Sequence, residues 1–198
     1  MLAMKLSKTE LRAKLKSQRQ NLAEADVKAW SEKIIGRCIK LIPWTEIKTL
    51  HTYVPVLKEN EVDSWHLLEY AWQMHPKIKT AVPVLSSSGK YDSVLVAPST
   101  KWQRQGLRIP EPIDGEVLPD GEQFDVVIVP MLGFDKAGHR LGHGKGWYDR
   151  FLATQPRALT IGLCYEFGLI KQGLPHEPHD VAVRHIVTEK IARKTATA

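Results

Sequence analysis

The segment 124–130 constrains the fold of this chain more than any other feature of its sequence. It reads Phe-Asp-Val-Val-Ile-Val-Pro, an unbroken β-branched run between turn-forming neighbours. A strand with one solvated face alternates apolar and polar residues, whereas a continuous apolar run is typical of a strand that is buried on both faces. We therefore predict a central strand here, in a largely parallel sheet that helices cover on both sides.

The rest of the chain alternates between helical and strand-like patterns. Apolar residues recur with helical spacing, or β-branched residues cluster, in eight further segments, which predict helices over 6–21, 27–41, 62–74 and 148–152 and strands over 49–54, 78–84, 91–96 and 159–164. Ser7 and Glu10 form a capping-box pattern at the first helix, and Pro43 ends the second. The stretch 97–121 reads as irregular surface. These elements predict a single α/β domain, 1–198, of Rossmann-like three-layer architecture, with a helical pair at 1–42 packed on the core.

Composition and charge narrow the functional classes. The 198 residues carry a formal net charge of +6, and the first helix concentrates basic side chains at Lys8, Arg12, Lys14, Lys16 and Arg19. A basic protein attracts anions, which leaves nucleic acids, membranes and phosphorylated small molecules as alternatives. No apolar run approaches the ~20 residues that cross a bilayer. The only two cysteines, Cys38 and Cys164, lie far apart. We therefore expect a cytoplasmic protein of a reducing compartment, with no membrane partner.

The glycine-rich segment 140–149, Arg-Leu-Gly-His-Gly-Lys-Gly-Trp-Tyr-Asp, is the strongest candidate for a functional site. It follows the predicted central strand, and ligands of open α/β sheets collect beyond the carboxyl ends of the strands. Its glycines let backbone N–H groups approach an anion, while Arg140 and Lys145 supply charge for phosphate oxygens. It is no Walker A loop, because His139 stands where the first glycine belongs and no Ser or Thr follows Lys145. A flexible surface turn remains an alternative at this point.

A longer pattern surrounds this segment. It reads Phe134-Asp-x-x-Gly138-x-Arg140-Leu-Gly-x-Gly-x-Gly-x-Tyr148-Asp149, and shorter motifs accompany it at Lys8-x-x-Leu11-Arg12, Glu61-Val-Asp63, Glu111-Pro112 and His179-Asp180. Together these motifs resemble the signature of the 5-formyltetrahydrofolate cyclo-ligases, in the family's order across nearly the whole chain. The resemblance implies an enzyme that uses ATP, with Mg²⁺, to convert 5-formyltetrahydrofolate to 5,10-methenyltetrahydrofolate with release of ADP and phosphate.

The same resemblance implies roles for individual residues. The catalytic residues would be Arg12 and Lys145, and the ATP-binding residues would be Lys8, Arg12, Arg140, Gly142, Gly144, Lys145, Gly146 and Tyr148. The folate-binding residues would be Val56, Glu61, His143, Gly144, Lys145, Gly146 and Trp147, with Trp102 as a further candidate wall of the pterin slot. Asp149 and Asp180 would hold Mg²⁺, a hard cation that prefers carboxylate oxygens.

Each assignment has a structural alternative. Lys8 and Arg12, which share one face of the predicted helix, could form a solvated basic surface. Glu61 and Asp149 could be acids at helix N-termini, and Asp180 an ordinary loop carboxylate. The aromatic residues could serve core packing alone.

Other functions compete with the cyclo-ligase. A relative could keep the ATP loop and act on a different small molecule. A basic nucleic-acid-binding module would explain the isoelectric point near 9.3, but the sequence contains no recognisable recognition fold. His176 and His179 are possible zinc ligands. A zinc site is disfavoured because Pro178 is unfavourable in a helix and the spacing of the two histidines is not that of an HExxH motif. We expect small-molecule substrates, no specific nucleic acid and a monomer.

Overall fold

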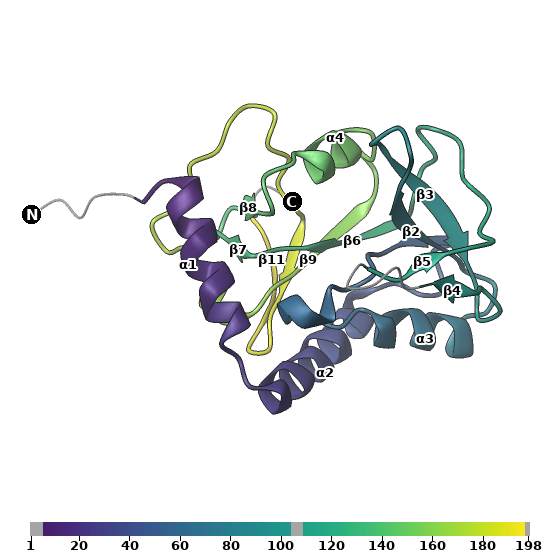
Figure 1. Cartoon of the computed structure of the whole chain (residues 1–198), viewed down its shortest axis with the longest axis horizontal. Helices are drawn as coiled ribbons and strands as arrows, with labels where there is room; N and C mark the ends of the chain where they lie inside the picture. The colour runs from purple at the N-terminus through teal and green to yellow at the C-terminus, as the bar shows by residue number, and fades with distance from the viewer. Residues whose placement is uncertain (1–5, 104–108, 197–198) are drawn as a thin grey trace, which may run out of the picture.

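The computed structural model describes residues 6–103 and 109–196, which form a seven-stranded sheet with helices on both faces (Figure 1). The strands are β1 (Thr49–His51), β2 (Lys79–Leu85), β3 (Tyr91–Val96), β6 (Val126–Pro130), β9 (Leu159–Leu163), β10 (His185–Val187) and β11 (Ala192–Lys194). Their order is β11-β10-β9-β6-β1-β2-β3, so the predicted central strand, β6, occupies the middle position. Only the two edge strands, β3 and β11, pair antiparallel with their neighbours, which confirms the largely parallel sheet.

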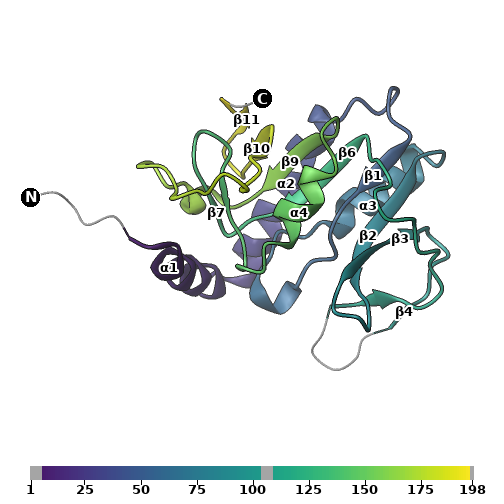
Figure 2. The same cartoon turned by 90° about the horizontal axis from the view of Figure 1, so that it is seen from above.

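Helices cover both faces of the sheet and make the outer two of three layers (Figure 2). The described residues contain α1 (Lys8–Gln20), α2 (Glu24–Leu41), α3 (Trp65–Met74) and α4 (Trp147–Ala153), with short 3₁₀ turns η1 (Leu57–Glu59) and η2 (Glu166–Gly168). Side chains of β6 alternate between two cores: Val126 and Ile128 pack with residues of α2 and α3, whereas Val127 and Val129 pack with Leu152 of α4. This alternation confirms the three-layer α/β class. No helix in the described part of the chain is long and apolar enough to cross a membrane.

The two N-terminal helices pack in different places. The inner face of α2 lies on the sheet, whereas α1 packs through Leu11 and Leu15 against Leu141 and Leu174, on loops beside the sheet. The predicted capping box is present, with the Ser7 hydroxyl accepting from Glu10 N and the Glu10 carboxylate accepting from Ser7 N. The position of α1 beside the loops brings its basic residues close to the glycine-rich segment.

Several short elements were not indicated by the sequence. Strands β10 and β11, and the two-stranded pairs β4 (Trp102–Gln103) with β5 (Glu111–Pro112) and β7 (Gly133–Phe134) with β8 (Arg140–Leu141), are too short to show a periodicity. The β4–β5 pair is the regular part of the stretch 97–121 expected to be irregular, of which 104–108 lies outside the described residues. The strand predicted over 49–54 ends at His51, and this frees the residues that follow it for the cavity described below.

Candidate active site

A cavity of about 370 Å³ opens beyond the carboxyl ends of β1, β2 and β6. Its volume lies within the range of small-molecule sites, about 300–1,000 Å³. The residues that line it include every catalytic, ATP-binding, folate-binding and metal-binding candidate named above, namely Lys8, Arg12, Val56, Glu61, Arg140, Gly142, His143, Gly144, Lys145, Gly146, Trp147, Tyr148, Asp149 and Asp180. Trp102 does not: it packs edge-on against Trp65, with ring centroids 4.7 Å apart. The structure therefore brings the candidate residues together, while their contacts with ligands stay predictions.

The glycine-rich loop runs between α1 and the sheet and depends on a backbone conformation that glycine allows. Gly144 has φ of +88°, and a Cβ there would lie 3.2 Å from Cζ of Arg12. The Nε of Arg12 donates a 3.0 Å hydrogen bond to the Gly142 carbonyl oxygen, so α1 holds the loop from outside. The loop leads directly into α4, whose first residue is Trp147.

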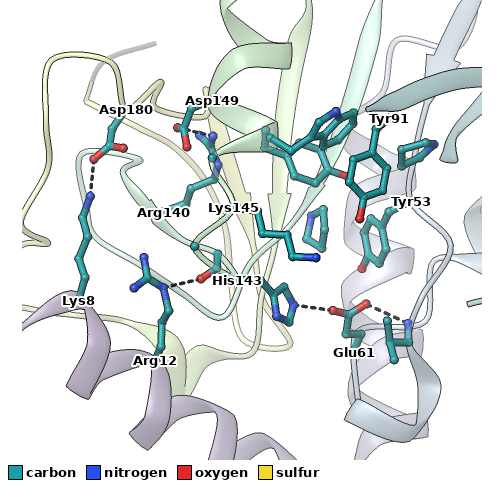
Figure 3. Close-up of a pocket in the computed structure, with 18 of the residues that line it drawn as sticks. Lys8, Arg12, Tyr53, Glu61, Tyr91, Arg140, His143, Lys145, Asp149 and Asp180 are labelled. Carbon is teal, nitrogen blue, oxygen red and sulfur yellow. Dashed lines mark hydrogen bonds and ion pairs between the residues drawn. The ribbon is translucent and has the colours of Figure 1, made fainter. Parts of the chain in front are cut away.

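One end of the cavity carries most of the charge (Figure 3). The buried Arg140 guanidinium donates a 2.6 Å bond to Oδ1 of Asp149 and also bonds the Val181 carbonyl oxygen. Burial lowers the pKa of Arg140, and the neighbouring Asp149 carboxylate opposes that shift. Lys8 contacts Oδ2 of Asp180 at 2.6 Å, and the backbone N–H of Glu177 donates to the same oxygen. Although burial raises the pKa of Asp180, these two hydrogen bonds lower it below its ordinary value.

Two further cations, Arg12 and Lys145, line the same cavity. Among the described residues, no carboxylate lies within ion-pair distance of Arg12 or Lys145. The side chain of Lys145 reaches across the cavity between its two ends (Figure 3). Unpaired cations beside a glycine-rich loop suit the oxygens of a phosphate group.

The opposite end is built from one buried carboxylate and aromatic rings. Glu61 is 5% exposed; its Oε2 accepts a 2.9 Å bond from Val56 N, and its Oε1 lies 3.2 Å from Nε2 of His143. Tyr53, Tyr91 and Trp147 line this end, and the rings of Tyr91 and Trp147 are 5.1 Å apart. A carboxylate that accepts hydrogen bonds beside flat apolar walls suits an aromatic ligand with an amino edge.

Some residues that line the cavity were not predicted as site residues from the sequence. They are Tyr53, Val54, Pro83, Tyr91, Ile109, Pro130, Glu177 and His179. Tyr53, Val54 and Pro130 end or follow strands of the parallel sheet, a position that marks ligand sites in such folds and that could have identified them. Tyr91 begins an antiparallel edge strand. It does not follow the carboxyl end of a parallel strand, so no such signal could have identified it.

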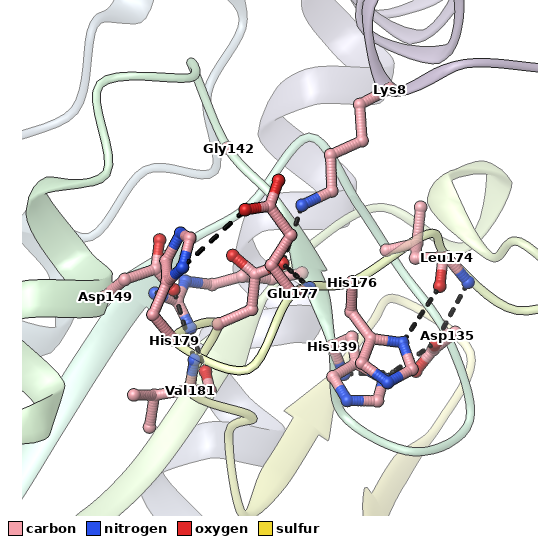
Figure 4. A network of polar contacts seen from close by, with 12 residues as sticks. Lys8, Asp135, His139, Gly142, Asp149, Leu174, His176, Glu177, His179 and Val181 are labelled. Carbon is pink, nitrogen blue, oxygen red and sulfur yellow. Dashed lines mark hydrogen bonds and ion pairs between the residues drawn. The ribbon is translucent and has the colours of Figure 1, made fainter.

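The two histidines of the zinc reading belong to different networks (Figure 4). The ring of His176 stacks on that of His139 with centroids 3.9 Å apart, and His139 contacts the buried carboxylate of Asp135 at 3.1 Å. The Nδ1 of His179 lies 3.7 Å from a carboxylate oxygen of Glu177. Within the described ranges, three metal-capable donors gather only at Glu59, Glu61 and His143.

Comparisons with known proteins agree on one family. The model of the 5-formyltetrahydrofolate cyclo-ligase family matches residues 4–189. A Mycolicibacterium smegmatis protein of that name is 32% identical, with 93% of this chain and 94% of the relative covered. The Escherichia coli K12 enzyme is 30% identical over 75% of this chain and 84% of its own. The solved Aquifex aeolicus 5,10-methenyltetrahydrofolate synthetase superposes with a TM-score of 0.79, at 30% identity, covering 96% of this chain and 94% of that chain.

Proposed function

The chain belongs to the 5-formyltetrahydrofolate cyclo-ligase family, and from this premise we propose that it converts 5-formyltetrahydrofolate and ATP to 5,10-methenyltetrahydrofolate, ADP and phosphate with Mg²⁺. The formyl oxygen is a poor leaving group, so its attack on the γ-phosphorus of ATP, with departure of ADP, makes it a phosphate ester. N10 then attacks the activated carbon and closes the ring. The formyl oxygen leaves within phosphate, and the N10 proton is lost.

The observation that carries this proposal is a single cavity with two chemically different ends. Lys8, Arg12 and Arg140 stand at one end, and Glu61 with its aromatic neighbours at the other, while Lys145 reaches between them (Figure 3). A reaction that transfers a phosphoryl group to the oxygen of a second substrate needs this arrangement, because both substrates must meet with their reacting atoms adjacent. Positioning and charge neutralisation are the protein's main contributions to phosphoryl transfer.

At the charged end, we assign the triphosphate to the basic side chains and the loop backbone. Arg12 and Lys145, which line the cavity and have no ion-pair partner among the described residues, neutralise charge on the transferring group. Lys8, Arg140 and the 142–146 backbone hold the remaining phosphate oxygens, and Tyr148 lines the same cavity. Helix α4 is short and begins only at Trp147, after the loop. The loop backbone therefore makes most of the main-chain contacts with the phosphate oxygens.

The donor set fits Mg²⁺ at Asp149 and Asp180. Both carboxylates line the charged end, and each uses one oxygen for its ion pair while the described residues supply no hydrogen bond to the other. Carboxylate oxygens together with phosphate oxygens are the usual ligands of this cation. When bound, Mg²⁺ supplies neutralisation of the β- and γ-phosphate charge.

At the acidic end, Glu61 accepts hydrogen bonds from the amino-pyrimidine edge of the folate. Val56, Trp147 and the backbone from His143 to Gly146 form the walls of this slot. His143 contacts the Oε1 of Glu61, which faces the cavity (Figure 3). These contacts fix the ring so that its formyl group points towards Lys145.

The proposal is tested by mixing the purified protein with 5-formyltetrahydrofolate, ATP and Mg²⁺. The near-ultraviolet absorbance of the methenyl product should rise with equimolar phosphate release, and it should depend on ATP. Lys145→Met should reduce turnover at least 100-fold, while its matched control Lys136→Met, an exposed lysine outside the cavity, should not. Absence of methenyl product from the wild type would contradict the function. Folate binding unchanged in Glu61→Ala, with nucleotide binding abolished in Lys145→Ala, would favour a relative with another substrate.

A further inference from the structure

A buried arginine lies behind the acidic end of the cavity. Arg19, in the last turn of α1, is 4% exposed. One of its terminal nitrogens lies 3.2 Å from Oε2 of Glu59, and the other lies 3.7 Å from Oε1 of Glu61. Glu61 lines the cavity, whereas Arg19 and Glu59 do not. Arg19 therefore contacts the candidate folate-binding carboxylate from the protein side.

The backbone that carries Glu59 and Glu61 is fastened to the end of α1. Asn60, between them, adopts φ of +54°, and its side-chain amide donates a 2.9 Å bond to the Arg19 carbonyl oxygen. Longer contacts from the same amide reach the carbonyl oxygens of Gln20 and Leu22. Asn60 thus caps the C-terminus of α1 while its two neighbours meet the Arg19 guanidinium. The position of Glu61 depends on this junction.

Electrostatics explain why a cation is needed there. The Glu61 side chain is 6% exposed, and an ionised carboxylate buried to that extent is unfavourable unless an opposite charge or hydrogen bonds compensate it. The Val56 N–H supplies a hydrogen bond to Glu61, and Arg19 supplies the opposite charge. Glu59, held also by Lys16 at 3.2 Å, fixes Arg19 from its other side. Arg19 and Lys16 also oppose a metal ion at the Glu59, Glu61 and His143 donors, because an added cation would face two fixed positive charges.

We propose that Arg19 is a positioning residue for folate recognition: it keeps the charged Glu61 aimed into the cavity and touches no substrate itself. The inference rests on the proposed function, in which Glu61 binds the pterin edge. Arg19→Met preserves much of the side chain's length and removes its charge. We expect this change to weaken 5-formyltetrahydrofolate binding at least tenfold and to alter the KM for ATP less than twofold.

A double-mutant cycle separates positioning from a general structural role. Binding of 5-formyltetrahydrofolate is titrated with wild type, Arg19→Met, Glu61→Gln and the double variant, and folding of each is verified by urea unfolding. If Arg19 acts through Glu61, adding Arg19→Met to Glu61→Gln should weaken binding less than twofold further. A tenfold loss that recurs in the Glu61→Gln background, or an unchanged affinity in Arg19→Met, would overturn the proposal.

Two more variants keep the test decisive. Lys16→Met removes a partly exposed partner of Glu59 that does not contact Glu61, and we expect less than a twofold effect on folate affinity. Arg19→Lys restores the charge and should bind 5-formyltetrahydrofolate at least twofold more tightly than Arg19→Met. If Arg19→Met does not fold, Arg19→Lys replaces it in the cycle, where we expect its affinity to lie at least threefold below that of wild type. No recovery in Arg19→Lys would contradict a charge-based role. Wild type that binds no folate would instead contradict the proposed function.

Discussion

Replacing Gly144 by alanine is expected to destabilise the protein and to disturb the charged end of the cavity. An L-residue in the left-handed region costs about 1–2 kcal/mol, and Gly144 has φ of +88°. Its new Cβ would also lie 3.2 Å from Cζ of Arg12 and 3.3 Å from Nε, the atom that bonds the Gly142 carbonyl oxygen. Arg12 must move or the loop must shift.

Gly142→Ala is the matched control for this loop. A Cβ at Gly142 would meet nothing within 4 Å, and its φ lies outside the left-handed region. Both substitutions reduce the conformational freedom of the unfolded chain by the same amount. That contribution cancels in the comparison, which leaves the strain of about 1–2 kcal/mol at Gly144.

Urea unfolding of the ligand-free proteins measures this difference. With an m-value of about 2 kcal/mol/M, the unfolding midpoint of Gly144→Ala should lie about 0.5–1 M below that of Gly142→Ala. The KM for ATP should also rise in Gly144→Ala because Arg12 is displaced. Equal midpoints for the two variants would show that Gly144 is not strained as described, and the reasoning would then fail.

Two further predictions concern buried titratable groups. Burial raises the pKa of Asp135, but hydrogen bonds from Leu174 N and from His139 lower it below the ordinary value. The ionised Asp135 carboxylate therefore stabilises the folded state. Its contribution is present above about pH 3.9 and is lost as pH falls through the folded pKa. Asp135→Asn should therefore lower the free energy of unfolding by about 1–3 kcal/mol at pH 7, and a gap to wild type that did not narrow below pH 4 would contradict this. Burial lowers the pKa of His51 to about 3, so protonation of the unfolded chain should cost wild type about 2 kcal/mol of stability between pH 7.5 and pH 5. His51→Leu should remove that part of the pH dependence in urea unfolding, and identical slopes for the two proteins would refute the assignment.

The sequence predicted those parts of the fold and site whose information is local. The β-branched run at 126–129 identified β6 because burial on both faces requires apolar residues at every position. Likewise, Arg140, Lys145 and Asp149 were predicted together because one loop and the start of one helix carry them. A contiguous motif keeps its residues close in space whatever the rest of the chain does.

What the sequence could not reveal depends on contacts between distant segments. Tyr53 and Tyr91 line one cavity only because β1, β2 and β3 are neighbours in the sheet. The ion pair of Lys8 with Asp180 joins residues that are 172 positions apart. A lysine at position 8 and an aspartate at position 180 are as compatible with two separate solvated charges as with an ion pair. Their pairing is therefore seen only in the folded structure.

The basic first helix shows how folding changes the meaning of a charge pattern. Lys8, Arg12, Lys16 and Arg19 recur at helical spacing, so they share one face of α1. All four contact other segments of the protein: Lys8 contacts Asp180, Arg12 the Gly142 carbonyl oxygen, Lys16 Glu59, and Arg19 both Glu59 and Glu61. At 1.5 Å per residue this face spans roughly 16 Å.

One rigid element therefore reaches both ends of the cavity. Leu11 and Leu15 anchor it against Leu141 and Leu174, so a displacement of α1 would move the phosphate-binding cations and the support of Glu61 together. Much of the charge that favoured a nucleic-acid surface faces the protein's own carboxylates and carbonyls. The positive charge of this helix is better explained by the assembly of the cavity than by an external polyanion.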